Sequence, residues 1–395
     1  MNITADVVVV GGGLEGAASA WALARRGVTD VVVCERDTVA SGMTAKSSGI
    51  VRCHYGVSSL AAMATQSLDL FENAAEILGS DIGFRQCGYV VGVGEPNIAA
   101  LRASLAAQRA VGVRTEEIDR DEVAKLWPQA YLDDFAAFGW EARGGYGDGY
   151  LLAQGFAAAA RRAGVRIRQN APVAEVLVEG GRTAGVRLAD GTTIGARSVV
   201  VAAGPWSPAL LAPLGIDVPM RVHREAVILL DPGLDLGPVP VLSDLVSLQY
   251  IRPELTNGLL FGDSDLAELE DADPDDYRNS ATSEAVDIAV EKISHRFPGL
   301  PDIAISSTYA GCYDVTPDFN PVISAAGIDG LWVAAGFSGH GFKISPAVGE
   351  LVADLVVDGR SNNPLIPERD FRLGRFAEGD LLRTPFPYVG AGEMR

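Results

Sequence analysis

The chain is poor in cysteine, histidine and lysine, and these shortages exclude several kinds of site. Its four cysteines are scattered and form no CxxC pair: Cys34, Cys53, Cys87 and Cys312. A disulfide framework, a zinc site and a dithiol redox pair are therefore disfavoured, and we expect no metal. The sequence has no basic block and a net charge of −19, so neither nucleic acid nor an anionic membrane is an expected partner.

Long apolar runs are also missing from the sequence. No stretch approaches the roughly 20 apolar residues of a transmembrane helix. The first strand begins within a few residues of Met1, which leaves no room for a secretory signal peptide. We therefore expect a cytoplasmic protein without a membrane span.

With 395 residues, the chain is too long for one simple core, and two interleaved domains are expected. We predict a nucleotide-binding domain of residues 1–82, 145–218 and 308–395, and a substrate domain of residues 83–144 and 219–307. The second domain contains stretches that alternate like antiparallel strands. The predicted fold class is α/β (α+β overall), with a Rossmann-like domain interleaved with a mixed or antiparallel-sheet domain.

The N-terminal segment predicts a βαβ unit that holds a dinucleotide. It contains an apolar strand, a glycine turn, a helix, a second strand and an acid: residues 7–10, Gly11-x-Gly13-x-x-Gly16, residues 17–26, residues 31–33 and Glu35. The glycines permit a tight turn, close approach to a pyrophosphate and close helix packing, and the helix N-terminus faces the phosphates. Glu35 is placed to accept hydrogen bonds from the adenosine ribose. The alternative is an ordinary buried βαβ unit without a ligand.

Two features favour FAD over NAD. The nucleotide fold is interrupted and later resumed, with residues 198–204 as a late strand. A final strand at 331–335, a glycine turn at 336–341 and a helix at 345–357 then present a second helix start. Such a helix start stabilises the negative charge that a reduced flavin develops. No second GxGxxG follows, so we expect one nucleotide cofactor, with electrons coming from the substrate.

Four segments carry a resemblance to a known family. They are the N-terminal fingerprint, Gly49-Ile-Val-Arg-Cys-His-Tyr-Gly56, Cys312-Tyr-Asp-Val-Thr-Pro-Asp318 and Ala335-Gly-Phe-Ser-Gly-His-Gly-Phe-Lys343. The chain resembles the D-amino-acid-oxidase superfamily of flavoproteins, and within it monomeric sarcosine oxidase and sarcosine oxidase β-subunit-like proteins. The resemblance implies bound FAD and oxidation of a carbon–nitrogen bond in a small amino acid or N-alkyl amino acid.

The resemblance also implies a substrate site. The lysine matching Lys343 binds the substrate carboxylate in the family, and Arg52 falls where an arginine assists it. Only four lysines occur, so a lysine in this glycine-rich segment suggests that a compact charge is needed there; the alternative is a helix-flanking lysine. Tyr313 matches a pocket tyrosine or is a core aromatic, and His54 or its neighbour Cys53 is expected to face the pocket.

The fingerprint and the resemblance together predict the FAD contacts. His340 among them either hydrogen-bonds the cofactor or is structural. The expected set is Gly11, Gly13, Leu14, Glu15, Gly16, Glu35, Arg36, Thr44, Ala45, Ser47, Ser48, Gly49, Ile50, Val173, Ala203, Gly204, Trp206, Gly336, Ser338, Gly339, His340, Gly341, Phe342 and Lys343.

The implied reaction is hydride transfer to the flavin from the carbon next to a neutral amine, giving an imine that water hydrolyses. The sequence offers no evident general base, and none is needed if nearby positive charge and desolvation lower the amine pKa. The flavin does the chemistry and the protein supplies position and electrostatics.

Three departures from sarcosine oxidase bear on cofactor and acceptor. Gly311 stands where that enzyme tethers its flavin through cysteine, with Cys312 one place late, so we expect dissociable FAD, with a link through Cys312 as the alternative. Gly49 replaces an arginine over the ring, and Leu260 replaces the lysine that activates oxygen. The acceptor is therefore left open between oxygen and an electron carrier.

Three functional hypotheses remain from the sequence. The first is a stand-alone FAD enzyme for a small secondary or N-methyl amino acid. The second is a flavin-carrying β-type subunit of a larger amine or imino-acid dehydrogenase, which passes electrons to partner subunits. The third is a flavin-binding fold whose catalytic role has lapsed.

Overall fold

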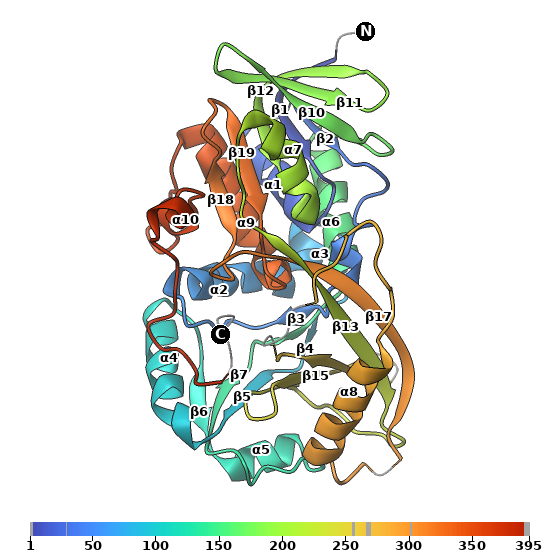
Figure 1. Cartoon of the computed structure of the whole chain (residues 1–395). Helices are drawn as coiled ribbons and strands as arrows, with labels where there is room; N and C mark the ends of the chain where they lie inside the picture. The colour runs from blue at the N-terminus through green and yellow to red at the C-terminus, as the bar shows by residue number, and fades with distance from the viewer. Residues whose placement is uncertain (1–2, 29, 255–256, 266–269, 301, 391–395) are drawn as a thin grey trace.

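The computed structural model describes residues 3–28, 30–254, 257–265, 270–300 and 302–390, and two large sheets occupy the upper and lower parts of Figure 1. The upper sheet has the order β10-β11-β12-β1-β2-β9, with β19 and β18 continuing beside β12. Its strands are β1 (Ile3–Val10), β2 (Val31–Cys34), β9 (Arg166–Arg168), β10 (Val173–Glu179), β11 (Arg182–Leu188), β12 (Thr193–Val201), β18 (Val322–Ala325) and β19 (Leu331–Ala335).

The centre of the upper sheet is parallel. Strands β19, β12, β1, β2 and β9 all run in the same direction, as in a dinucleotide-binding fold. Strand β12 pairs with β11 along its first half and with β19 along its second half, so two distant chain segments share one of its edges. Valines dominate β1 and β2 because these strands are buried on both faces.

Three helices pack closely beside this sheet: α1 (Leu14–Arg25), α6 (Gly149–Arg162) and α9 (Gly341–Asp358). Helix α1 is rich in alanine, which lets its neighbours approach closely. A Cβ atom on Gly349 of α9 would lie 2.6 Å from the Ala18 carbonyl oxygen of α1, so the α1–α9 contact requires a glycine there. Helix α2 (Ser58–Glu72) packs against α9 across the middle of the molecule (Figure 1).

The lower sheet is almost entirely antiparallel. Its order is β17-β13-β16-β15-β14-β5-β7-β6, and only the β14–β5 pair is parallel among the described strands. The strands are β5 (Tyr89–Val93), β6 (Glu116–Ile118), β7 (Ala137–Glu141), β13 (Arg221–Asp231), β14 (Val241–Asp244), β15 (Gln249–Pro253), β16 (Leu259–Asp263) and β17 (Ala304–Val315). The predicted fold class is confirmed by the combination of a parallel and an antiparallel sheet.

Shorter elements complete the lower part and join the two sheets. A small sheet lies between them, formed by β3 (Ile50–Val51), β8 (Gly145–Tyr146) and β4 (Arg85–Gln86). The helices of the lower part are α4 (Ile98–Ala110), α5 (Arg120–Leu126) and α8 (Ser283–Arg296), and the short helix α3 (Ala74–Ile77) follows α2.

One local prediction was wrong in its boundary. The final helix begins at Gly341 rather than at 345, so Lys343 lies in its first turn and not in the preceding loop. Helices α2 and α3 meet at Asn73, which ends the first and precedes the second.

Candidate functional site

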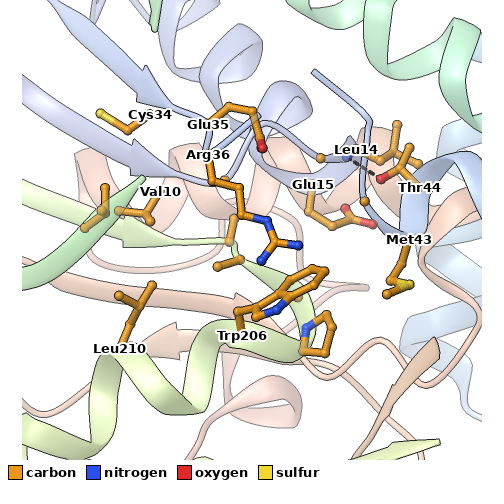
Figure 2. A pocket seen from close by; sticks show the side chains of 18 of the residues that line it. Val10, Leu14, Glu15, Cys34, Glu35, Arg36, Met43, Thr44, Trp206 and Leu210 are labelled. Atoms are coloured by element: carbon orange, nitrogen blue, oxygen red, sulfur yellow. Dashed lines mark hydrogen bonds between the residues drawn. The ribbon is translucent and has the colours of Figure 1, made fainter. Parts of the chain in front are cut away.

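The larger cavity, of about 370 Å³, lies at the carboxyl ends of the parallel strands. Val10 ends β1, Cys34 ends β2, Ala202 follows β12 and Ala334 belongs to β19, and all four line the cavity. This is the edge at which open α/β sheets bind their ligands. Figure 2 shows the cavity, which is also lined by Gly11, Gly13, Leu14, Glu15, Glu35, Arg36, Ser41, Gly42, Met43, Thr44, Pro172, Val173, Ala203, Gly204, Pro205, Trp206, Ala209, Leu210 and Phe337.

The glycine turn brings backbone directly to one wall of this cavity. Gly11 has a φ of 106°, and a Cβ atom there would lie 2.3 Å from the Ala202 carbonyl oxygen, so only glycine fits. Helix α1 then begins at Leu14, whose N–H donates to Thr44 Oγ1 at 3.0 Å (Figure 2). The first turn of α1 therefore presents a positive helix end to the cavity.

Glu35 lies at the end of the cavity predicted to take the ribose. Its Oε2 accepts the Gly12 N–H at 2.7 Å and its Oε1 accepts the Asp37 N–H at 2.9 Å. Each carboxylate oxygen has a second lone pair, so two ribose hydroxyls can still donate to it.

Arg36 and Trp206 form a wall beside Glu35. The Arg36 guanidinium lies 4.0 Å from the Trp206 ring centroid (Figure 2). Asp275 holds both residues, at 2.7 Å from Arg36 Nη1 and 2.9 Å from Trp206 Nε1. The loop that carries Asp275 thus fixes a flat surface against which an adenine ring can pack.

Glu15 is a half-buried acid in the first turn of α1. Its Oε2 has no hydrogen-bond partner among the described residues. Burial raises its pKa well above the usual range, and the nearby Asp314 raises it further. Burial also raises the pKa of Asp314 to about 6, although Asp314 accepts the N–H groups of Gly336 and Phe337 at 2.7 and 3.1 Å. Two carboxyl groups with raised pKa values therefore lie near the turn that precedes α9.

A smaller cavity of about 60 Å³ lies between the β3 segment, α9 and the lower sheet. Two predicted substrate residues, Arg52 and Lys343, provide its positive charge, and Tyr313 contributes a phenol from β17. The other lining residues are Ser48, Ile50, Tyr89, Glu225, Ser243, Tyr250, Asp263, Ser264, Gly339 and His340. The structure thus brings together cations, acids and hydroxyl groups suited to a small polar ligand.

His340 is neutral and uses both ring nitrogens within the protein. Burial, and then the charge of Lys343, lower its pKa to about 3. Its Nε2 lies 2.7 Å from the Phe319 carbonyl oxygen, which can only accept, so Nε2 carries the proton. Its Nδ1 lies 3.4 Å from the Tyr55 hydroxyl. These contacts favour the structural interpretation of His340, although it lines the smaller cavity.

His54 does not reach either cavity. Its buried ring lies against Tyr388, with Nε2 2.9 Å from the Tyr388 hydroxyl, and its Nδ1 is 3.2 Å from Gln108 Nε2. Cys53, the alternative at this position, is buried and lines neither cavity. Of the three neighbours, Arg52 is the one that the structure places in the smaller cavity.

The predicted FAD contacts divide into three groups. The larger cavity is lined by Gly11, Gly13, Leu14, Glu15, Glu35, Arg36, Thr44, Val173, Ala203, Gly204 and Trp206. The smaller cavity is lined by Ser48, Ile50, Gly339, His340 and Lys343. Neither is lined by Gly16, Ala45, Ser47, Gly49, Gly336, Ser338, Gly341 or Phe342, although Gly16 supports the glycine turn, since its Cβ would lie 2.0 Å from the Gly11 carbonyl oxygen.

Sequence reasoning missed part of each wall. In the larger cavity it missed Met43 and Phe337, which lie beside predicted contacts in the chain. In the smaller cavity it missed Glu225, Tyr250 and Asp263, which come from β13, β15 and β16. The alternation of β13 was a local signal for which side chains share a face, but no local signal tells which strand covers the cavity.

Cys312 faces away from the smaller cavity. It precedes Tyr313 on β17, and neighbouring side chains of a strand point to opposite faces. Its buried thiol lines neither cavity, and burial raises its pKa to about 11. The thiolate that a flavin link requires is therefore disfavoured.

Comparison with known proteins establishes the family. The model of the family described as FAD dependent oxidoreductase (DAO) matches residues 6–355, so the chain belongs to this family of FAD-dependent enzymes. The predictions of an FAD-dependent oxidoreductase and of its superfamily are confirmed.

Three relatives illustrate the similarity. The sarcosine oxidase subunit beta of Arthrobacter sp is 28% identical over 389 residues, covering 95% of this chain and 92% of that protein. The mitochondrial dimethylglycine dehydrogenase of Rattus norvegicus is 26% identical over 389 residues, covering 94% of this chain and 45% of that protein. The crystal structure of L-proline dehydrogenase from P. horikoshii superposes with a TM-score of 0.88 at 26% identity, covering 96% of this chain and 100% of that chain.

The larger cavity has the donor set that the FAD diphosphate and adenosine need. The backbone N–H groups of the glycine turn and of the start of α1 can bind the diphosphate, and Glu35 can accept hydrogen bonds from the ribose. Glu15 Oε2, which has no hydrogen-bond partner among the described residues, can bind a polar atom of the cofactor. Among the described residues, no group of histidines, cysteines and acids has a geometry able to hold a metal ion. No helix in the described ranges has both the length and the apolar character for crossing a membrane.

Proposed function

We propose that this enzyme uses FAD to oxidise the carbon–nitrogen bond of a small amino acid or N-alkyl amino acid, giving an imine that hydrolyses. The observation that carries this proposal is the smaller cavity, where Arg52 and Lys343 lie together among hydroxyl groups. Two cations in a confined site suit a carboxylate, which would fix the orientation of the rest of the substrate. The names of the relatives support the substrate class, since they include oxidases and dehydrogenases of sarcosine, dimethylglycine and proline.

In this proposal the protein supplies position and charge. Bound FAD would supply the hydride acceptor. Lys343, in the first turn of α9, and Arg52, which lies over the Tyr55 ring at 4.7 Å, hold the substrate carboxylate. Tyr313 and Tyr250 are half-buried residues whose phenol pKa values are raised by burial of the ring, so both stay protonated and can donate hydrogen bonds.

The test is an anaerobic screen of flavin reduction. FAD-loaded protein is mixed with amino acids, N-methyl amino acids, cyclic imino acids and hydroxy acids, and the loss of the yellow flavin absorption is recorded. Bleaching by an amine bearing a carboxylate, and not by the hydroxy acids, supports the proposal. Bleaching by none of them would favour the lapsed catalytic role.

A second candidate is a dehydrogenase subunit that passes electrons to a partner. Leu260, which stands where the oxygen-activating lysine of the resembled oxidase falls, is a fully buried residue of β16 and lines neither cavity. Slow reoxidation of the reduced protein by oxygen, together with co-purifying subunits, would support this candidate. Rapid turnover of the isolated chain with oxygen would contradict it.

We also propose a cytoplasmic location and a division of the chain into two domains. The division into residues 1–82, 145–218 and 308–395 against 83–144 and 219–307 is supported by the two large sheets, which draw mainly on those respective segments. Limited proteolysis tests the boundaries, and cell fractionation tests the location.

A further inference from the structure

The smaller cavity contains an acid that the proposed reaction has not yet used. Glu225 of β13 lines it together with Arg52 and Lys343. The Glu225 side chain is 15% exposed, and its Oε1 lies 3.0 Å from Nε2 of His223, two residues earlier on the same face of the strand. A carboxyl group paired with an imidazole is a group able to accept and release a proton at moderate pH.

The contacts of His223 determine where protons lie in this pair. His223 Nδ1 is 3.0 Å from the Glu270 carbonyl oxygen, which can only accept, so Nδ1 carries a proton. The short contact between Nε2 and Glu225 Oε1 then requires one proton between them, either on the imidazolium or on the carboxylic acid. A bare imidazole nitrogen facing a carboxylate at 3.0 Å would be repulsive. Glu225 Oε1 therefore shares a proton with His223, and Glu225 Oε2 is the oxygen that can bind a ligand.

Asp263, the other acid that lines the cavity, already has partners within the protein. Asp263 of β16 forms an ion pair with Lys292 Nζ at 2.8 Å and accepts the Asp265 N–H at 2.8 Å. Lys292 thus neutralises Asp263. The phenols of Tyr250 and Tyr313 remain protonated. Glu225 is therefore the lining group best placed to take up a proton.

We propose that Glu225 accepts the proton that the substrate ammonium loses, with His223 as its partner in a proton-holding pair. This inference rests on the proposed function. An N–H bond of the ammonium breaks, its electron pair stays on nitrogen, and an O–H bond forms at Glu225 Oε2. The lone pair left on nitrogen is what hydride transfer from the neighbouring carbon to bound FAD would require. The role of Glu225 supplies the base that the sequence did not reveal.

The surroundings of Glu225 set the pH at which it works. Burial raises its pKa, His223 and Arg224 lower it, and Asp263 raises it, with a net shift upward. The charged and titratable groups that act on it or line the same cavity are His223 and Arg224 of β13, Tyr89 of β5, Tyr250 of β15, Asp263 of β16, Tyr313 of β17, Arg52 after β3, and His340 and Lys343 at the start of α9. Glu225 thus titrates above the usual range of an acid, and below that pH it can no longer accept a proton.

The test measures anaerobic flavin reduction against pH, using an amine that bleaches the wild-type enzyme. We expect the wild-type ratio of the limiting reduction rate to the dissociation constant to stay level between the pKa of Glu225 and that of the alkylammonium, about 10. Glu225→Gln must instead bind the scarce free amine. For this variant, the ratio of the limiting reduction rate to the dissociation constant should rise tenfold per pH unit. It should lie roughly 1000-fold below the wild-type ratio at pH 7 and reach it at about pH 10.

Matched variants separate a proton role from a structural one. Glu225→Asp should keep the level profile at a lower rate, and Glu175→Gln removes a half-exposed carboxylate of β10 and should change nothing. His223→Asn should move the acid limb to higher pH, because His223 lowers the pKa of Glu225. If Glu225→Gln does not bind FAD, the acid limb of His223→Asn still tests the proposal.

The proposal is overturned if Glu225→Gln shows a level profile parallel to the wild type, or if His223→Asn leaves the acid limb in place. A wild-type enzyme that no amine reduces would instead count against the proposed function. The two failures are thus distinguishable.

Discussion

Arg375 and Asp318 form an ion pair in which both side chains are fully buried, with Arg375 Nε 2.7 Å from Asp318 Oδ2 and Nη2 2.9 Å from Oδ1. Asp318 lies in the turn after β17, and Arg375 lies in the segment that follows α9. Asp318 also accepts the Leu382 N–H at 3.0 Å. The pair therefore anchors the C-terminal segment to the turn that leads into β18.

Removing one partner of this pair should be strongly destabilising. Asp318→Asn or Arg375→Met would leave a buried charge without its counter-charge, and we expect the free energy of unfolding to fall by about 3–5 kcal/mol. Urea denaturation measures this change. The control is Asp329→Asn, which breaks an exposed pair with Arg182 and should cost less than about 1 kcal/mol. Equal losses in the two variants would contradict the prediction.

The same pair predicts loss of stability in acid. Burial raises the pKa of Asp318, but the hydrogen bond and charge of Arg375 outweigh it, so the folded-state pKa lies below the usual range. A depressed pKa contributes stability above the unfolded-state value, about 3.9, and that stability is lost as pH falls through the folded value. Denaturation at a series of pH values should show a smaller acid loss in Asp318→Asn. An identical acid loss in that variant and the wild type would assign the effect to other groups.

Glu15 should make FAD binding depend on pH. As a neutral acid it can donate to the diphosphate, whereas once ionised it repels that group. We therefore expect the dissociation constant of FAD to rise as the pH passes the raised pKa of Glu15. Glu15→Gln, which donates at every pH, should lose this dependence. Quenching of FAD fluorescence on binding provides the measurement, and parallel curves for the two proteins would refute the role of Glu15.

Lys343 should matter for the substrate carboxylate and not for the flavin reaction itself. A hydrogen bond to a charged group contributes about 1.5–3 kcal/mol, so Lys343→Met should raise the substrate dissociation constant roughly 10- to 100-fold. The loss should disappear with an amine that lacks the carboxylate. Lys125→Met, on the exposed side of α5, is the control for removing a lysine charge. An unchanged constant in Lys343→Met would remove Lys343 from the substrate site.

The FAD should be released when the protein unfolds. Cys312 faces away from the smaller cavity and its thiol pKa is raised to about 11, so no link to the flavin is expected. Acid precipitation should leave the yellow colour in the supernatant, for both the wild type and Cys312→Ser. Colour retained in the wild-type pellet and lost from the variant pellet would show a covalent bond.

The nucleotide half of the site could be predicted because its signals are local. Strand β1, the glycine turn and α1 follow one another in the chain, and Glu35 comes after the next strand. The start of α9 was placed four residues late, because Gly341 is a poor helix former in isolation. Its position is fixed by packing, since a Cβ atom there would lie 2.6 Å from Glu15 Oε1 and 3.1 Å from Phe337 Cβ.

The substrate half depended on strand pairing across long sequence separations. Glu225 pairs with Gly311 and His223 with Tyr313, which brings β13 against β17 from almost ninety residues away. A short stretch of sequence cannot encode such a register, so the acid that shares the smaller cavity with Arg52 and Lys343 could be recognised only in the folded chain.

The turn that leads into α9 has a practical consequence for redesign. Phe337 lines the larger cavity, Gly339 and Lys343 line the smaller one, and Gly349 locks the same helix onto α1. A library aimed at new amines would disturb flavin retention if it randomised this helix. Ser243 of β14 and Ser264 after β16 line the smaller cavity from the lower sheet. These positions can be varied without changing the residues that line the nucleotide cavity.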